Sequence, residues 1–301
     1  MAIDYNNAKF LISCLGRGVS YEKTLTLGHL GTFLPKPITR KLLDQYSITI
    51  GDNEQYLTRG GSEDDEYSDW FFYMLGCSHL DTMDFSDYEA ATVIHDLNTS
   101  IPDSLVEQFD CVVDGGTIEH VFNYPIAIAN AMRMVKVGGS LILDQPFNNC
   151  AGHGFYQPSP ELFFAALSKN NGFEVIRVIV CEDFPCSQWY EVQNPEAIQA
   201  RVILTNKAPV RVLVAARKTS SFSGFGVWPA QSDYKRSWAK PAKNENSTTT
   251  QGRVGLVEKL RRVAKKINHE WYWSYSVRRN ANRGLKERSL ANQEHFKPVT
   301  H

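Results

Sequence analysis

The sequence lacks several features that define whole classes of protein. No apolar run approaches the roughly 18 to 20 residues that a membrane span needs. The N-terminal residues lack the charged-then-apolar layout of a signal peptide. The six cysteines are scattered and form no CxxC pair, which disfavours a zinc site or a disulfide framework. We therefore expect a cytoplasmic protein without a bound metal, whose thiols are reduced and mostly in the core.

Two nucleotide-binding fingerprints are also missing. The chain contains neither GxxxxGK[ST] nor a complete GxGxxG. The first absence argues against nucleoside triphosphates, and the second argues against nicotinamide cofactors and hence against a nicotinamide-dependent oxidoreductase.

The net charge is small, but the charges are unevenly distributed. The net charge is −1, yet residues 251–301 contain twelve Lys/Arg against four Glu, or about +8, which leaves about −9 on residues 1–250. Such a basic segment can contact an anionic surface. The alternative is a solvated extension whose aromatic residues, around Trp271 and Trp273, pack on the parent domain. We do not expect nucleic acid as the partner.

Length and composition suggest one large domain with additions. A chain of 301 residues can bury a full core. We predict a folded domain over 1–218 and a flexible linker over 219–250, which is rich in Ser, Gly, Asn and Thr. A basic, aromatic-containing extension follows over 251–301, with a helix expected at 255–267.

The most informative stretch is 109–146, which predicts a βαβ unit of a parallel sheet. A β-branched, apolar run indicates a buried strand, which breaks at an Asp-Gly-Gly loop. Helical spacing of apolar residues follows, and the paired glycines after Lys136 suit a left-handed helix cap. A second buried strand ends before Pro146. The predicted elements are strand 109–113, helix 125–135 and strand 140–143.

This stretch resembles class I S-adenosylmethionine-dependent methyltransferases, of the bacterial type 11-like group. The similarity lies in FDxVxxxxxxEHV, a helix, a lysine before two glycines and a strand ending in proline. It continues in the pattern SPE, helix, NGF, strand over 159–180, and in a strand over 210–216 that is typically antiparallel in this class. The resemblance covers roughly 21–218. It implies an α/β fold with a doubly wound, mostly parallel, seven-stranded-type sheet, although other doubly wound domains contain similar units.

The resemblance also implies S-adenosylmethionine as cofactor, bound at the carboxyl ends of the first four strands. The turn TLGHLG is a degenerate form of the first-strand glycine loop, which makes Gly28 and Gly31 candidates; an ordinary tight turn is equally open. Asp84 ends the predicted strand 80–83 and suits a ribose diol. Asp96 follows a strand over 92–94, where the class places a side chain near the adenine. The alternative is that both aspartates are turn residues.

The loop after the fourth strand supplies the remaining cofactor-binding candidates, Asp114, Gly115 and Glu119. It contains no Asn/Asp-Pro-Pro-aromatic sequence, which disfavours amide or nucleobase amine acceptors. We therefore expect O-methylation of a sugar, glycan or small metabolite. The segment GHGFYQPSPELF is similar to bacterial methyltransferases associated with surface glycans.

A hydroxyl acceptor needs a base, and a histidine can accept a proton near neutral pH. His120 follows the fourth strand, and His153 lies between two glycines on the next loop, where Tyr156 could orient the acceptor. The alternatives are that His120 packs at a helix start and that His153 only decorates a turn. A non-catalytic binding or scaffold protein on the same fold is the alternative function.

The spacing departs from the family pattern in two places. About eight residues separate strand 80–83 from strand 92–94, too few for a crossover helix, whereas about fifty separate Gly31 from Asp84. Either the first strand is 24–28 with an insertion after it, or it is 71–76 with a shortened loop. We favour the first reading.

Overall fold

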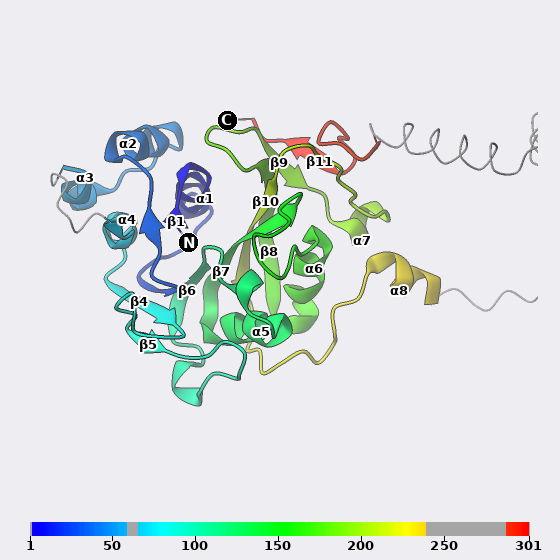
Figure 1. The fold of residues 1–301 in the computed structure, drawn as a ribbon, viewed down its shortest axis with the longest axis horizontal. Coiled ribbons are helices and arrows are strands. Elements are labelled where there is room, and N and C mark those ends of the chain that lie inside the picture. Colours follow the sequence, from blue (N-terminus) through cyan, green and yellow to red (C-terminus); the bar gives the residue numbers. More distant parts are fainter. Residues whose placement is uncertain (1, 59–65, 239–286, 301) are drawn as a thin grey trace, which may run out of the picture.

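The computed structural model describes residues 2–58, 66–238 and 287–300 of the chain. Its centre is a nine-stranded sheet with the order β11-β9-β8-β10-β7-β6-β2-β4-β5 (Figure 1). The strands are β2 (Lys23–Leu27), β4 (His79–Asp84), β5 (Val93–Ile94), β6 (Phe109–Asp114), β7 (Val135–Asn148), β8 (Phe173–Glu182), β9 (Trp189–Val192), β10 (Val210–Lys218) and β11 (Phe296–Pro298). A separate parallel pair joins β1 (Ala2–Ile3) to β3 (Gly31–Thr32).

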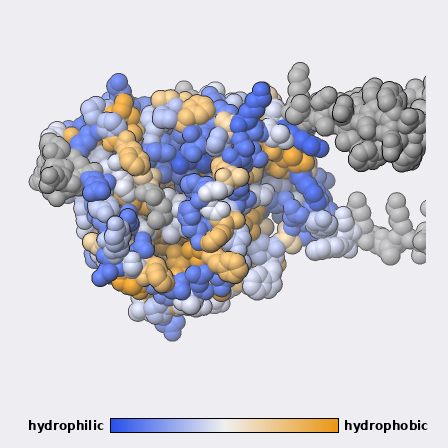
Figure 2. Space-filling view, in the orientation of Figure 1, coloured by the Kyte–Doolittle hydropathy of each residue, from blue (hydrophilic) through white to orange (hydrophobic). Residues whose placement is uncertain are grey.

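Helices cover both faces of the sheet (Figure 1). On one side lie α1 (Tyr5–Leu15), α2 (Lys36–Gln45), α3 (Gln55–Thr58) and α4 (Asp69–Met74); α5 (Tyr124–Met134) and α6 (Pro160–Ala166) lie on the other. Two short helices, α7 (Pro195–Ile198) and α8 (Ser232–Trp238), lie toward the β9 end. Each face of the sheet has its own hydrophobic cluster, one including Phe163 and Met132, the other Phe10 and Phe72. Figure 2 shows that the surface in this view alternates between apolar patches and hydrophilic side chains.

Strand directions confirm the predicted doubly wound, mostly parallel sheet. Strands β5, β4, β2, β6 and β7 are parallel, and β10 pairs antiparallel with both β7 and β8. The strand predicted over 210–216 is therefore antiparallel, as expected. The sheet has two strands more than the predicted seven. One of them, β11, comes from the predicted extension and buries Phe296 completely.

The β6–α5–β7 unit confirms the strand and helix predicted from 109–135, but the predicted helix cap is wrong. The helix ends at Met134 and β7 begins at once. Phe109 pairs with Val135 and Cys111 with Ser140, so the glycines form a bulge within the strand. Gly138 has φ +89°, and a Cβ on Gly139 would lie 2.7 Å from the Asp110 carbonyl oxygen. The glycines are needed by this bulge rather than by a helix end.

The predicted end of the following strand is also wrong. Strand β7 runs through Pro146 to Asn148. Strand β6 stops at Asp114, opposite Leu143, so beyond that point β7 has a ladder partner only in β10. The missing N–H of the proline is tolerated because one side of the strand is unpaired there.

The structure confirms the favoured explanation of the two unusual spacings between predicted strands. Strand β2 lies between β4 and β6, and residues 71–74 belong to α4, so the first strand is the one near 24–28 with an insertion after it. Strands β4 and β5 are parallel without an intervening helix. The insertion includes a 3-10 turn (Gly51–Glu54) and α3.

Other local predictions gave mixed results. Ser159 caps α6, its Oγ accepting from the Glu161 amide, and Gly172 has φ +73° before β8. A 3-10 turn, Asp103–Leu105, precedes β6. Four cysteines are buried free thiols, as expected: Cys14, Cys77, Cys111 and Cys181. The helix predicted at 255–267 and the aromatic residues after it lie outside the described residues.

A membrane span is not found in the described part of the chain, where no helix is both long enough and apolar enough to cross a bilayer.

Candidate functional site

Charged side chains gather where the parallel strands end. Strands β2, β4, β5, β6 and β7 run in one direction, so their carboxyl ends share one edge of the sheet. The antiparallel β10 begins at the same edge, because Val210 pairs with Asn148 of β7 and with Glu182 of β8. Open α/β sheets bind ligands at this edge.

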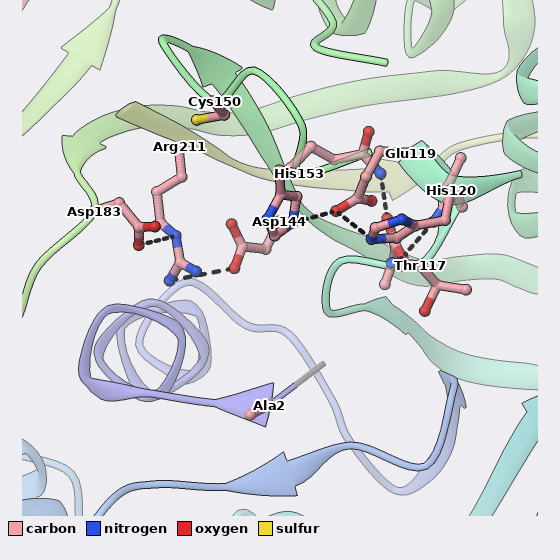
Figure 3. Close-up of polar contacts among 12 residues, drawn as sticks. Ala2, Thr117, Glu119, His120, Asp144, Cys150, His153, Asp183 and Arg211 are labelled. Atoms are coloured by element: carbon pink, nitrogen blue, oxygen red, sulfur yellow. Dashed lines mark hydrogen bonds and ion pairs between the residues drawn. The ribbon is translucent and has the colours of Figure 1, made fainter. Parts of the chain in front are cut away.

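A cavity of about 300 Å³ opens beside the ends of β6 and β7. Its walls come from the N-terminal segment, the loops after β3, β6 and β7, the end of β8 and the start of β10. Glu119, His120 and His153 form one wall, and Asp144, Asp183 and Arg211 form another (Figure 3).

Glu119 is the buried centre of the first wall. It lies in a 3-10 turn, Ile118–His120, directly after β6. Its Oε1 is 3.4 Å from Nε2 of His153 and 3.9 Å from Nε2 of His120 (Figure 3). The Glu119 side chain is 0% exposed, and neither carboxylate oxygen has a hydrogen-bond partner. Burial, and then the nearby carboxylates of Asp114 and Asp144, raise the pKa of Glu119 to about 9.

The side chains of the two histidines are about half exposed. Their side chains are 48% exposed for His120 and 57% for His153. Partial burial, together with the neighbouring His153, lowers the pKa of His120. Both imidazoles are therefore available to a bound molecule while remaining in contact with a buried acid. The structure brings together these two predicted catalytic residues and Glu119.

The loop that carries His153 is fixed to Glu119 through backbone bonds. The amides of Phe155 and Tyr156 donate to the Glu119 carbonyl oxygen at 3.0 and 3.2 Å. A Cβ on Gly154 would lie 3.0 Å from Cγ of Glu119 and 3.1 Å from its carbonyl oxygen. A larger residue would require Glu119 to shift by a few tenths of an ångström, so Gly154 helps to hold His153 close to Glu119.

Asp114 has a different place from the one predicted for it. It is 0% exposed, and its Oδ1 accepts from the amides of Thr117 at 2.8 Å and Ile118 at 3.2 Å. Oδ2 accepts from Nε2 of Gln145 at 2.5 Å. Burial raises its pKa to about 6, although these hydrogen bonds oppose the shift. Asp114 therefore holds the turn that presents Glu119, and a direct contact with a cofactor is not supported.

Arg211 organises the opposite wall. Its Nη1 is 2.7 Å from Oδ2 of Asp4. The same nitrogen is 3.5 Å from Oδ2 of Asp144, and Nε is 3.2 Å from Oδ1 of Asp183 (Figure 3). Burial raises the pKa of Asp144 to about 7, although Arg211 opposes the shift.

The sequence analysis missed all four residues of this wall, Asp4, Asp144, Asp183 and Arg211. Each lies at an end of a separate element: before α1, in β7, after β8 and at the start of β10. Strand direction is the one sequence-level signal that could have indicated this wall. An antiparallel last strand must begin at the edge where the parallel strands end, and its second residue is an arginine.

Comparison with known proteins gave structural matches only. No family model and no curated protein matches the sequence. The 1,6-didemethyltoxoflavin-N1-methyltransferase of Burkholderia thailandensis, solved with 1,6-didemethyltoxoflavin and S-adenosylhomocysteine, is 13% identical with a TM-score of 0.36, covering 71% of this chain and 79% of that one. A TehB-like SAM-dependent methyltransferase from Corynebacterium glutamicum is 14% identical, with a TM-score of 0.34 and coverages of 69% and 87%.

A third match has a different activity. The branched-chain polyamine synthase of Thermus thermophilus, solved with N4-aminopropylspermidine and 5'-methylthioadenosine, is 10% identical with a TM-score of 0.39. The match covers 75% of this chain and 58% of that one. TM-scores this low carry no weight for function, which the residues of the site must support by themselves.

The predicted ribose and adenine residues lie along the same edge but outside the cavity wall. Asp84 is half-buried at the end of β4, where its Oδ1 accepts from the Phe85 amide at 2.6 Å. Oδ1 of Asp96 accepts from the amide of Asn98 at 2.9 Å and from its Nδ2 at 2.8 Å. These hydrogen bonds lower the pKa of Asp96. Asp96 thus forms the turn that was the alternative reading, and its assignment to adenine stays a prediction.

The two glycines of TLGHLG have separate places. Gly28 has φ +81°, and its amide donates to the Met83 carbonyl oxygen at 2.7 Å, which brings it beside Asp84. Gly31 belongs to β3, where it pairs with Ala2. Gly115 is packed tightly, because a Cβ there would lie 2.9 Å from a methyl group of Leu30. Gly28 therefore remains a candidate for close approach to a ligand. Gly31 has a role in strand pairing, and Gly115, although tightly packed against Leu30, lines the cavity, so its contact with a cofactor stays a prediction.

The hydroxyl of Tyr156 bonds to the protein backbone. Its hydroxyl donates to the Phe122 carbonyl oxygen at 2.7 Å, and its ring centroid is 5.1 Å from that of Tyr124. This hydrogen bond occupies the hydroxyl proton that was expected to orient an acceptor. Tyr156 therefore anchors the loop behind His153.

Proposed function

We propose that the protein is an S-adenosylmethionine-dependent methyltransferase that acts on a hydroxyl group. The observation that carries this proposal is the placement of two open histidines on a buried acid, at the sheet edge that also carries the strand-end carboxylates. One part of this edge suits an adenosine and the neighbouring cavity suits an acceptor. The sequence resemblance to class I methyltransferases supports the same assignment.

The residues at β2 and β4 fit the proposed cofactor. A ribose diol needs an acceptor at the end of the strand beside the glycine turn, and the half-buried Asp84 lies there. Gly28, with its positive φ, leaves room for backbone approach beside it. S-adenosylmethionine supplies an activated methyl group when bound, so the chain has mainly to align the acceptor and exclude water.

The histidines are placed to remove the acceptor's proton. We propose that His120 or His153 accepts it, since each has an exposed ring on the cavity wall. Three exposed aromatic rings surround this region: Phe33 on the cavity wall, and Phe122 and Phe155, which touch each other with centroids 6.4 Å apart. Exposed apolar rings around a polar cavity favour a ligand with both polar and apolar surfaces, such as a sugar, glycan or small metabolite.

Transfer of labelled methyl groups tests this function. Purified protein is incubated with S-adenosylmethionine labelled in the methyl group and with a panel of sugars, glycans and lysate fractions from which macromolecules were removed. Label in a base-stable ether product supports the proposal. Cofactor binding without transfer to any fraction would favour the alternative, a non-catalytic binding or scaffold protein.

Substitution of Asp84 should weaken cofactor binding. We expect Asp84→Ala to cost roughly 1.5 to 3 kcal/mol of binding free energy, the usual size of hydrogen bonds to a charged acceptor. Isothermal titration calorimetry measures this change. Asp81→Ala is the matched control, because Asp81 lies on the same strand and pairs with His79 at 3.0 Å. An unchanged dissociation constant in folded Asp84→Ala would remove this residue from the site.

The basic segment is a separate proposal. Residues 251–286 carry most of the positive charge of the C-terminal region, and we propose that they contact an anionic surface in the cytoplasm. Deleting 251–301 would also remove β11, so the test replaces Arg261, Arg262, Lys265 and Lys266 by glutamine. We expect weaker retention on anionic vesicles at low salt and unchanged cofactor binding. Equal retention by both proteins would leave the segment without this role.

A further inference from the structure

We propose that Glu119, His120 and His153 form a binding site for one divalent transition-metal ion. One carboxylate oxygen and two imidazole nitrogens, one from each residue, all lie within 4.8 Å of one another. The sequence analysis expected no metal, because the ligands come from two loops and form no spaced motif.

The spacing of these atoms suits a common ion. Two ligands about 2.1 Å from a tetrahedral ion lie roughly 3.4 Å apart. Oε1 of Glu119 and Nε2 of His153 are 3.4 Å apart, and the same oxygen is 3.9 Å from Nε2 of His120. Small side-chain rotations of the two exposed histidines would bring all three atoms onto one centre.

The buried carboxylate supplies an independent reason for a cation. Both oxygens of Glu119 are buried and have no hydrogen-bond partner. A buried polar group without a partner costs free energy unless something satisfies it, and for an ionised carboxylate a cation does so best. The close crossing at Gly154 holds this acid next to His153. The fold therefore keeps the carboxylate buried, and without a cation its desolvation remains unfavourable.

The donor set and the surrounding charge select the class of ion. Two nitrogens and one oxygen suit zinc, iron, cobalt or manganese, whereas magnesium and calcium prefer oxygen ligands alone. The described residues of the cavity wall include four carboxylates, on Asp4, Glu119, Asp144 and Asp183, against the single guanidinium of Arg211. A cation bound there would stabilise the ionised form of Glu119, which burial disfavours. The cavity leaves the open side of the ion free for a further ligand.

The cation would change how the acceptor is activated. A hydroxyl bound to a divalent cation has a lower pKa, so it loses its proton to water without help from an imidazole. In that case the histidines act as ligands rather than as bases. This consequence rests on the proposed function, whereas the binding of the metal does not.

A metal titration tests the site directly. The full chain is treated with a chelator, dialysed, and titrated with Co²⁺ while its visible absorption is followed; Zn²⁺ is then added in competition. We expect one tight site per chain. Because even residues around a ligand affect metal affinity by roughly 10 to 100-fold, we expect Glu119→Gln and His153→Gln to weaken binding by about 100-fold or more.

The matched control is His79→Gln. His79 is an exposed histidine that also pairs with a carboxylate, Asp81, at 3.0 Å, but it lies outside the cluster. It should leave the tight site unchanged, and thermal unfolding confirms that each variant is folded. Wild-type affinity in folded His153→Gln, or the absence of a tight site in the wild type, would overturn the proposal.

Chelation of the active enzyme separates this inference from the proposed function. If the cation acts on the acceptor, a chelator abolishes methyl transfer and Zn²⁺ or Mn²⁺ restores it, while S-adenosylmethionine still binds. If transfer is unaffected by a chelator that removes all metal, the cation has no part in activating the acceptor and a histidine base remains; the binding site itself is decided by the titration. Tight metal binding without any methyl transfer would support the site and count against the proposed function.

Discussion

At least one of the variants His120→Gln and His153→Gln is expected to lower turnover by roughly 10² to 10⁴, the usual size of a proton-transfer contribution. Both imidazoles contact the buried acid Glu119 at the cavity wall, and glutamine keeps the bulk without accepting a proton. Binding of S-adenosylmethionine should be preserved, because neither residue lies at β2 or β4. Turnover and calorimetric binding, measured on the same preparations, test this expectation.

The same control used for metal binding serves here. His79→Gln removes an exposed histidine at the far end of β4 and should leave turnover unchanged. Loss of turnover in only one of the two cluster variants, with metal binding unchanged, would identify that residue as the base. Full turnover in both would mean that the acceptor needs only alignment, and neither histidine would keep its role.

Lys218→Met is expected to produce the largest loss of stability. Lys218 is 0% exposed, and its Nζ donates to the carbonyl oxygens of Val135 at 2.8 Å and Met132 at 3.1 Å. It also pairs with Oε1 of Glu107 at 3.2 Å. These carbonyls end α5, so methionine would leave them and a carboxylate without their buried donor. We expect the free energy of unfolding to fall by about 3 kcal/mol.

Urea denaturation measures this loss, and Lys136→Met is the matched control. Lys136 pairs with Asp110 at 3.2 Å, the same distance as the Lys218–Glu107 pair, but its side chain is 41% exposed. An exposed pair contributes little, so this change should cost less than about 1 kcal/mol. If both substitutions lower the free energy of unfolding by the same amount, Lys218 does not support the end of α5.

The sequence predicted the sheet where the signal was local. Strand 109–113 and helix 125–135 follow from an apolar run and from helical spacing, and both are present. The bulge at Gly138 and the continuation of β7 through Pro146 were not predictable in this way. Each depends on which strand lies alongside and where that strand stops, which a single segment does not record.

The site was predictable only in part for the same reason. Glu119, His120 and His153 follow two neighbouring strands, so strand order alone places them together. Asp114 was assigned to a ligand because its burial and its bond to Gln145 are invisible in the sequence. The wall around Arg211 was missed because Arg211 and its three partners come from four separate elements.

Calorimetric titration of the wild-type protein with S-adenosylmethionine tests the central claim most directly. The account predicts saturable binding of one cofactor per chain, with a dissociation constant in the range of roughly 1 μM to 1 mM that enzymes show for their substrates. Binding should weaken in Asp84→Ala and persist in Asp81→Ala. Folded wild-type protein that releases no heat and shows no saturation with either S-adenosylmethionine or S-adenosylhomocysteine would contradict the account.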